Sequence, residues 1–197
     1  MSLIRAVLAD FAALFAPARP QEKSGRREWL LVLLIVTAGA VLRFWGLGAV
    51  GLHGDEETMA MPTQHIVEHG TPILPSGMFY PRAIGQLYLM AASVATFGQN
   101  EWALRLPSAL CGVLLIVLSY FVGRRFLALR WNLAFVAAVA LLPEFIVDAQ
   151  TARMYVFFVA SVAAFLLFLF RWERTERPAY LAGAVLMVLV EIGRAHV

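Results

Sequence analysis

The chain has 197 residues, of which 61% are hydrophobic and 15% are charged. Its mean hydropathy of +0.75 excludes an ordinary soluble domain and places it in the membrane class. The net charge of +3 comes from arginines clustered between apolar runs, a pattern that indicates membrane topology and not a nucleic-acid partner. The single cysteine, Cys111, cannot form an intrachain disulfide.

Residues 1–28 are predicted to form a short helix on the cytoplasmic membrane surface, followed by a basic linker. A signal peptide is the alternative, but Asp10 would interrupt its apolar region. The first spanning helix is predicted over residues 29–47, whose length matches the hydrocarbon thickness. Arg43 lies near the outer end of this span, and we expect its side chain to reach the lipid headgroups.

Residues 48–103 are predicted to form a large external loop, with helical character over residues 57–69. The apolar stretch 83–97 is interpreted as an interfacial or re-entrant helix. Counting it as a span would place a cluster of arginines outside, against the preference of basic loops for the cytoplasm. That cluster consists of Arg124, Arg125 and Arg130.

Further spans are predicted at residues 104–123, 131–147, 154–170 and 179–190. The fold class is therefore an all-α polytopic membrane protein with a cytoplasmic N-terminus. Residues 191–197, EIGRAHV, resemble a translated sequencing adapter and interrupt the last apolar run. We therefore expect a truncated transmembrane domain over residues 29–190 and a non-native tail, in a fragment of a longer protein.

The charged residues of the external segments gather near the outer boundary and leave the middle of the spans uncharged. An external carboxylate at Asp55 or Glu56 could act as a general base or bind a metal, with a solvated acidic loop as the alternative. Glu101 and Arg105, one helical turn apart, are expected to form an ion pair. A transporter would more often place polar groups at the bilayer midplane, so this distribution favours chemistry at the outer surface.

The ordered series HGDEETMA, EHGTPILPSGMFYPRAIGQLYL, FGQNEWALRLPSALCGVLLIVLSYFVGRR and DAQTARMYVFFVA resembles the bacterial glycosyltransferase family 39. That family is related to protein O-mannosyltransferases and to the aminoarabinose transferase of lipid A. The resemblance covers residues 29–170. It implies a GT-C fold, whose N-terminal transmembrane bundle has a large external first loop containing interfacial helices. It also implies a polyprenyl-phosphate-linked sugar donor and reaction on the outer side of the bacterial inner membrane.

The resemblance also implies roles for individual residues. Asp55 matches the family's catalytic base, and Glu56 completes an Asp-Glu pair that would orient the base or the acceptor. Where the aminoarabinose branch carries a lysine before a proline, this chain has Tyr80, Pro81 and Arg82, which makes Arg82 a candidate phosphate ligand. The predicted substrate-binding set comprises Tyr80, Arg82, Asp148 and Arg153.

The function predicted is inverting transfer of a sugar from the polyprenyl-phosphate carrier to a lipid, glycan or protein acceptor, although this fragment is not expected to work alone. The alternatives are a transporter or flippase fragment with an external charged vestibule, and a non-catalytic assembly subunit. No residue is assigned as a metal ligand. A divalent metal held by the acids with His53, His65 or His69 remains an alternative.

Overall fold

The structure is a computed structural model that describes residues 25–192, with side chains through residue 189. The predicted N-terminal surface helix and residues 193–197 of the predicted tail lie outside this range. The helices are α2 (Arg26–Phe44), α3 (Asp55–His69), α4 (Ile84–Phe97), α5 (Glu101–Gly123), α6 (Leu129–Leu141), α7 (Pro143–Ala149), α8 (Tyr155–Thr175) and α9 (Pro178–Ile192). Within residues 25–192 there is no strand, only one isolated bridge between Ile73 and Phe79. The all-α prediction is confirmed.

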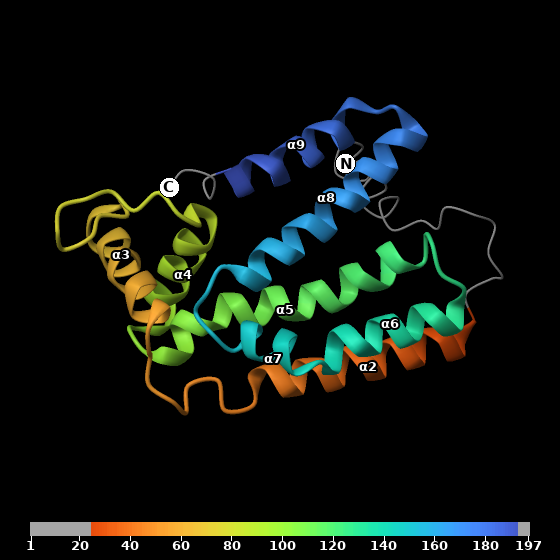
Figure 1. Cartoon of the computed structure of the whole chain (residues 1–197), viewed down its shortest axis with the longest axis horizontal. Coiled ribbons are helices and arrows are strands. Elements are labelled where there is room, and N and C mark those ends of the chain that lie inside the picture. The colour runs from red at the N-terminus through yellow and green to blue at the C-terminus, as the bar shows by residue number, and fades with distance from the viewer. Residues whose placement is uncertain (1–24, 193–197) are drawn as a thin grey trace, which may run out of the picture.

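The long helices run along a bundle, and α3 and α4 gather at one end of it (Figure 1). At that same end α2 and α7 finish and α5 and α8 begin (Figure 1). The predicted external loop and the turn before α8 are therefore neighbours in space. This arrangement brings residues from distant parts of the sequence to one end of the bundle.

Two of the described helices, α5 and α8, are long and apolar enough to cross a membrane, and α6 with α7 adds a third if the bent pair is one span. Helix α4 is apolar but has only 14 residues. At about 1.5 Å per residue it is shorter than the roughly 30 Å of hydrocarbon in a bilayer. Its length agrees with the prediction that it does not cross.

Helix α2 is less apolar at its ends than the predicted first span suggests. It carries Arg26, Arg27 and Glu28 in its first turn and Arg43 in its last turn. Between these charges, Leu30, Leu31, Leu33 and Leu34 are 47–65% exposed. Exposed leucines along one helix are typical of contact with lipid, and the crossing by α2 stays a prediction.

The span predicted at residues 131–147 is two helices, α6 and α7, which meet at an angle of 52°. Pro143 is the first residue of α7. It has no backbone N–H and cannot continue the hydrogen-bond ladder of α6, so the helix breaks there. Hydropathy alone does not reveal this break, because the residues on both sides of it are apolar.

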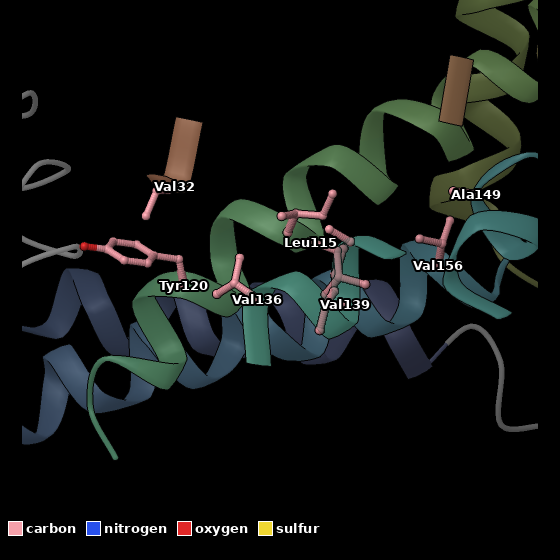
Figure 2. Packing of buried hydrophobic residues seen from close by; sticks show 10 residues of the cluster. Val32, Leu115, Tyr120, Val136, Val139, Ala149 and Val156 are labelled. Carbon is pink, nitrogen blue, oxygen red and sulfur yellow. The ribbon is translucent and has the colours of Figure 1, made fainter. Parts of the chain in front are cut away.

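Helix α5 lies at the centre of the bundle core. Figure 2 shows Leu115 and Tyr120 of α5 beside Val136 and Val139 of α6, with Val156 of α8 in the same cluster. A second hydrophobic cluster joins α3 and α4 to the bundle. Its members include Met59 and Ile66 of α3, Leu87 and Met90 of α4, and Ala103 and Leu104 of α5. Helices α3 and α4 are thus packed on the bundle, which makes them a firm support for a site.

Arg43 is fully buried, so the expectation that its side chain reaches the headgroups is wrong. Its guanidinium turns inward and donates hydrogen bonds to the carbonyls of Gly39, Val139 and Ala140. The broken end of α6 offers backbone acceptors there, and these outweigh the attraction of the membrane surface.

Candidate active site

A cavity of about 180 Å³ lies between the start of α3, the segment before α4 and the start of α8. It is lined by Asp55, Thr58, Met59, Tyr80, Arg82, Arg153, Met154 and Tyr155. Four of the predicted site residues, Asp55, Tyr80, Arg82 and Arg153, therefore come together. The remaining two, Glu56 and Asp148, do not line the cavity.

Asp55 is the first residue of α3, which begins two residues earlier than the predicted helical stretch. Gly54 makes the preceding turn with φ at +62°, a conformation that favours glycine. The Asp55 Oδ2 atom lies 3.2 Å from Nη2 of Arg153, and the two side chains are 69% and 33% exposed. The helix N-terminus adds a favourable field for the carboxylate. Asp55 is therefore both held by a cation and open to an incoming molecule.

Thr58 and Met59 were not assigned from the sequence, yet both line the cavity with Asp55. They follow Asp55 at the i+3 and i+4 positions, which share one face of a helix. Helical spacing from Asp55 could have identified them. Met154 and Tyr155 come from the start of α8, and no local pattern connects them with α3.

Glu56 points into the protein and is 1% exposed. Its two carboxylate oxygens accept hydrogen bonds from Nε and Nη2 of Arg105 at 2.9 and 2.8 Å, and Oε1 also accepts from the Ala152 N–H at 2.7 Å. Burial favours a higher pKa for Glu56, but these hydrogen bonds outweigh it and hold the pKa below its ordinary value. Glu56 is therefore an ionised anchor within the protein.

The predicted ion pair between Glu101 and Arg105 is wrong in its partner, because Arg105 pairs with Glu56. Arg105 also donates to the backbone carbonyls of Leu47, Val50 and Gly51. A single buried guanidinium thus joins α5 to the loop that leads into α3.

The Glu56 contacts are one constraint on how the two charged cavity residues face each other. Asp55 precedes Glu56 in the chain, and Arg153 follows Ala152, whose N–H Glu56 accepts. The buried carboxylate thus ties the two segments together one residue away from the cavity. This explains how Asp55 and Arg153, from segments far apart in sequence, meet at hydrogen-bonding distance.

Tyr80 and Arg82 enter the cavity from the segment before α4. Burial raises the pKa of the Tyr80 hydroxyl; the positive charge of Arg82 opposes this rise and the negative charge of Asp55 adds to it. Tyr80 therefore keeps its proton at neutral pH and can donate a hydrogen bond. Ala83, with φ at 50°, makes a sharp turn between Arg82 and α4.

Asp148 lies half-buried on α7, close enough to Arg153 for their charges to interact. Its predicted contact with substrate stays a prediction. Among residues 25–192, no three or more His, Cys, Asp or Glu side chains are grouped to hold a metal. His65 and His69 stack on each other with ring centroids 4.4 Å apart. The divalent-metal alternative stays untested.

The family model described as dolichyl-phosphate-mannose-protein mannosyltransferase matches residues 82–193, more than half of the chain. No curated protein and no solved structure matches. The matched region includes Arg82 and Arg153 and begins after Asp55. It also contains the central helix α5 and all later helices through α9. The chain therefore belongs to the dolichyl-phosphate-mannose-protein mannosyltransferase family, of GT-C type, and is a membrane glycosyltransferase of the mannosyltransferase kind.

Proposed function

We propose that the protein transfers a sugar from a polyprenyl-phosphate carrier to an acceptor at the outer face of the membrane, with inversion at the anomeric carbon and Asp55 as general base. One observation carries this proposal: the carboxylate of Asp55 and the guanidinium of Arg153 meet at 3.2 Å in a cavity that Arg82 also lines. An anionic base beside two cations is the charge pattern that displacement of a phosphate needs. The family match supports the reaction class.

In the proposed step the acceptor oxygen attacks the anomeric carbon as its bond to the phosphate oxygen breaks. The acceptor's proton passes to the Asp55 carboxylate, and the electron pair of the broken bond leaves with the polyprenyl phosphate. Because attack and departure occur on opposite faces of one carbon, the configuration inverts. The 69% exposure of the Asp55 side chain suits entry of an acceptor from outside the protein.

The departing phosphate gains negative charge in the transition state, and Arg153 and Arg82 are the cations that line the cavity. A guanidinium can bind phosphate through two parallel hydrogen bonds. A donor phosphate would compete with Asp55 for Arg153 and leave a carboxylate oxygen to accept the acceptor's proton. The neutral Tyr80 hydroxyl could donate a further hydrogen bond to the phosphate or the sugar.

An apolar cavity of about 360 Å³ between α5, α6, α7 and α8 supports a lipid-linked donor. Val159, Val162 and Leu166 line it and follow Tyr155 of the polar cavity at the i+4, i+7 and i+11 positions. These positions share one face of α8. A prenyl chain whose phosphate lies by Arg153 would follow this face into the bundle.

Asp55→Asn tests the proposed base, with Glu57→Gln as the matched control, because Glu57 is an exposed acid in the same helical turn. Membranes carrying each full-length variant are incubated with a polyprenyl-phosphate mannose labelled in the sugar. The rate at which labelled mannose passes from the lipid fraction to acceptors is then measured. Removing a general base predicts a fall in transfer of about a hundredfold or more in Asp55→Asn, with Glu57→Gln unchanged.

Both variants should accumulate in the membrane like the wild type, because the Asp55 side chain is largely exposed. Transfer by Asp55→Asn at the wild-type rate would exclude Asp55 as base. Movement of intact donor across the vesicle membrane, without any covalent transfer of sugar, would instead indicate a transporter. The anomeric configuration of the product tests inversion.

A further inference from the structure

The break between α6 and α7 leaves backbone carbonyls without their helical donors. In a continuous helix the carbonyl of Val139 would accept from the N–H of residue 143, but Pro143 has none. Ala140 lies in the same final turn of α6, where carbonyls lack partners within the helix. Such groups are costly to leave unpaired where lipid replaces water. The break therefore requires donors from elsewhere in the fold.

Arg43 of α2 supplies these donors from almost a hundred residues away. Its Nη2 donates to the Val139 carbonyl at 3.0 Å, and its Nη1 donates to the Ala140 carbonyl at 2.9 Å. Nη1 also donates to Gly39 in its own helix at 3.0 Å. The carbonyl ends of α2 and α6 both carry partial negative charge, so the buried cation lies in a favourable field.

Two glycines make room for the guanidinium. A Cβ atom at Gly112 would stand 2.8 Å from Arg43 Nε and 2.6 Å from Ala149 Cβ. A Cβ atom at Gly39 would stand 3.2 Å from Arg43 Nη1. The helices thus approach closely around Arg43, which leaves its side chain little freedom to move.

Gln150 makes the reciprocal contact. It follows the last residue of α7, and its Nε2 donates to the carbonyls of Leu42 and Trp45 at the end of α2. Arg43 of α2 thus caps the broken end of α6, and Gln150, which follows α7, caps the end of α2. Arg43 and Gln150 together fix α7 against α2.

We propose that Arg43 is a positioning residue for the transfer reaction: by holding the bend between α6 and α7, it sets where Arg153 stands relative to Asp55. The path is short, because α7 ends at Ala149, Gln150 binds α2, and Arg153 follows three residues later. This inference rests on the proposed function for its catalytic consequence. The bend itself can be measured without substrate.

The first experiment measures the bend. Spin labels are placed at Trp131→Cys on α6 and Val147→Cys on α7, two positions that are 59% and 56% exposed, in a full-length Cys111→Ala background. Distances between the labels are then compared for wild type, Arg43→Gln and the control Arg27→Gln. Arg27→Gln removes one positive charge from the same helix, as Arg43→Gln does, but at an exposed position. We expect a shifted or broadened distance distribution in Arg43→Gln only.

The second experiment measures transfer by the same variants. Displacing Arg153 should lower kcat by roughly tenfold to a hundredfold in Arg43→Gln, because small errors in position are enough to slow a displacement. Arg43→Lys keeps the charge but cannot reach two carbonyls in the same way. Arg43→Lys should therefore accumulate in the membrane to the wild-type level, but with only part of the wild-type kcat.

Pro143→Ala, combined with Arg43→Gln, keeps the proposal testable if the single variant is too unstable. It restores an N–H for the Val139 carbonyl and should restore the protein level, while the label distance and kcat stay altered. Full recovery of kcat in the double variant would make Arg43 merely structural and overturn the proposal. Unchanged distances and kcat in Arg43→Gln would overturn it as well. If the wild type itself transfers no sugar, the proposed function fails, and the distances alone decide the role of Arg43 in the bend.

Discussion

Asp55 and Glu56 are adjacent acids with opposite surroundings. Successive residues of a helix are turned by about 100°, so when Asp55 faces the cavity Glu56 faces inward. Asp55 is 69% exposed and contacts Arg153, whereas Glu56 is 1% exposed and binds Arg105. Glu56 is therefore a buried anchor beside Asp55, and the orienting role that the family resemblance implies for it stays a prediction.

Glu56→Gln should destabilise the protein at neutral pH. Breaking one side of a buried, hydrogen-bonded ion pair costs about 3 kcal/mol, since Arg105 keeps its charge without the carboxylate. The folded-state pKa of Glu56 is depressed, so the stability that its ionised form contributes is present above the unfolded pKa of about 4.3. That contribution is lost as the pH falls through the lower folded-state pKa.

The midpoint of thermal unfolding, measured in detergent from pH 7 to pH 3.5, checks this prediction. The difference between wild type and Glu56→Gln should be largest at pH 7 and should shrink toward the acid end. Glu57→Gln, an exposed neighbour, should follow the wild type throughout. A difference between wild type and Glu56→Gln that is independent of pH would show that the ionised carboxylate is not the stabilising form.

At the scale of elements, hydropathy and helical spacing predicted the helices well but not the contacts between them. The helix over residues 57–69 was accessible from local pattern. The prediction that α4 does not cross came from the charges of the later loops, and its 14 residues agree with it. The inward turn of Arg43 was not, because its acceptors lie 96 and 97 residues away. The sequence could place charged residues near one membrane boundary, but not choose which charge meets which partner.

Gly112→Ala tests the close packing of α5 on α7. Alanine is the better helix former by about 1 kcal/mol, so helix propensity alone predicts stabilisation. The added Cβ would meet Ala149 Cβ at 2.6 Å, and that atom is fixed to the backbone of α7. Overpacking costs about 1–3 kcal/mol, and the gain in helix propensity offsets about 1 kcal/mol of it, so we expect a net loss of up to about 2 kcal/mol. Gly51→Ala, with nothing within 4 Å of the new atom, is the control for thermal unfolding. A higher midpoint in Gly112→Ala would show that α7 can move away.

Across the whole molecule, buried arginines join segments that are distant in sequence. Arg105 binds Glu56 of α3, Arg43 binds the end of α6, and Arg124 binds Glu28 of α2 at 2.7 Å. The Glu28 carboxylate also accepts from the Tyr120 hydroxyl at 2.6 Å. These charges hold the bundle at both of its ends. The charged residues that line the cavity, Asp55 and Arg153, are more exposed than these arginines. The charges with a structural role are therefore buried, and those with a proposed chemical role are accessible.

Cysteine labelling tests the topology that would place the cavity outside. Glu68→Cys on α3 and Phe126→Cys between α5 and α6 are introduced separately into full-length Cys111→Ala protein. The 14 residues of α4 predict that it does not cross, so α2 and α5 should cross in opposite directions, with the arginines around Phe126 in the cytoplasm. A membrane-impermeant maleimide should therefore label residue 68 in spheroplasts, and residue 126 only after lysis. The Cys111→Ala parent is the control for background labelling. Labelling of residue 126 in intact spheroplasts would mean that α4 crosses. Protection of residue 68 would place the cavity on the cytoplasmic side and exclude an outer-face acceptor.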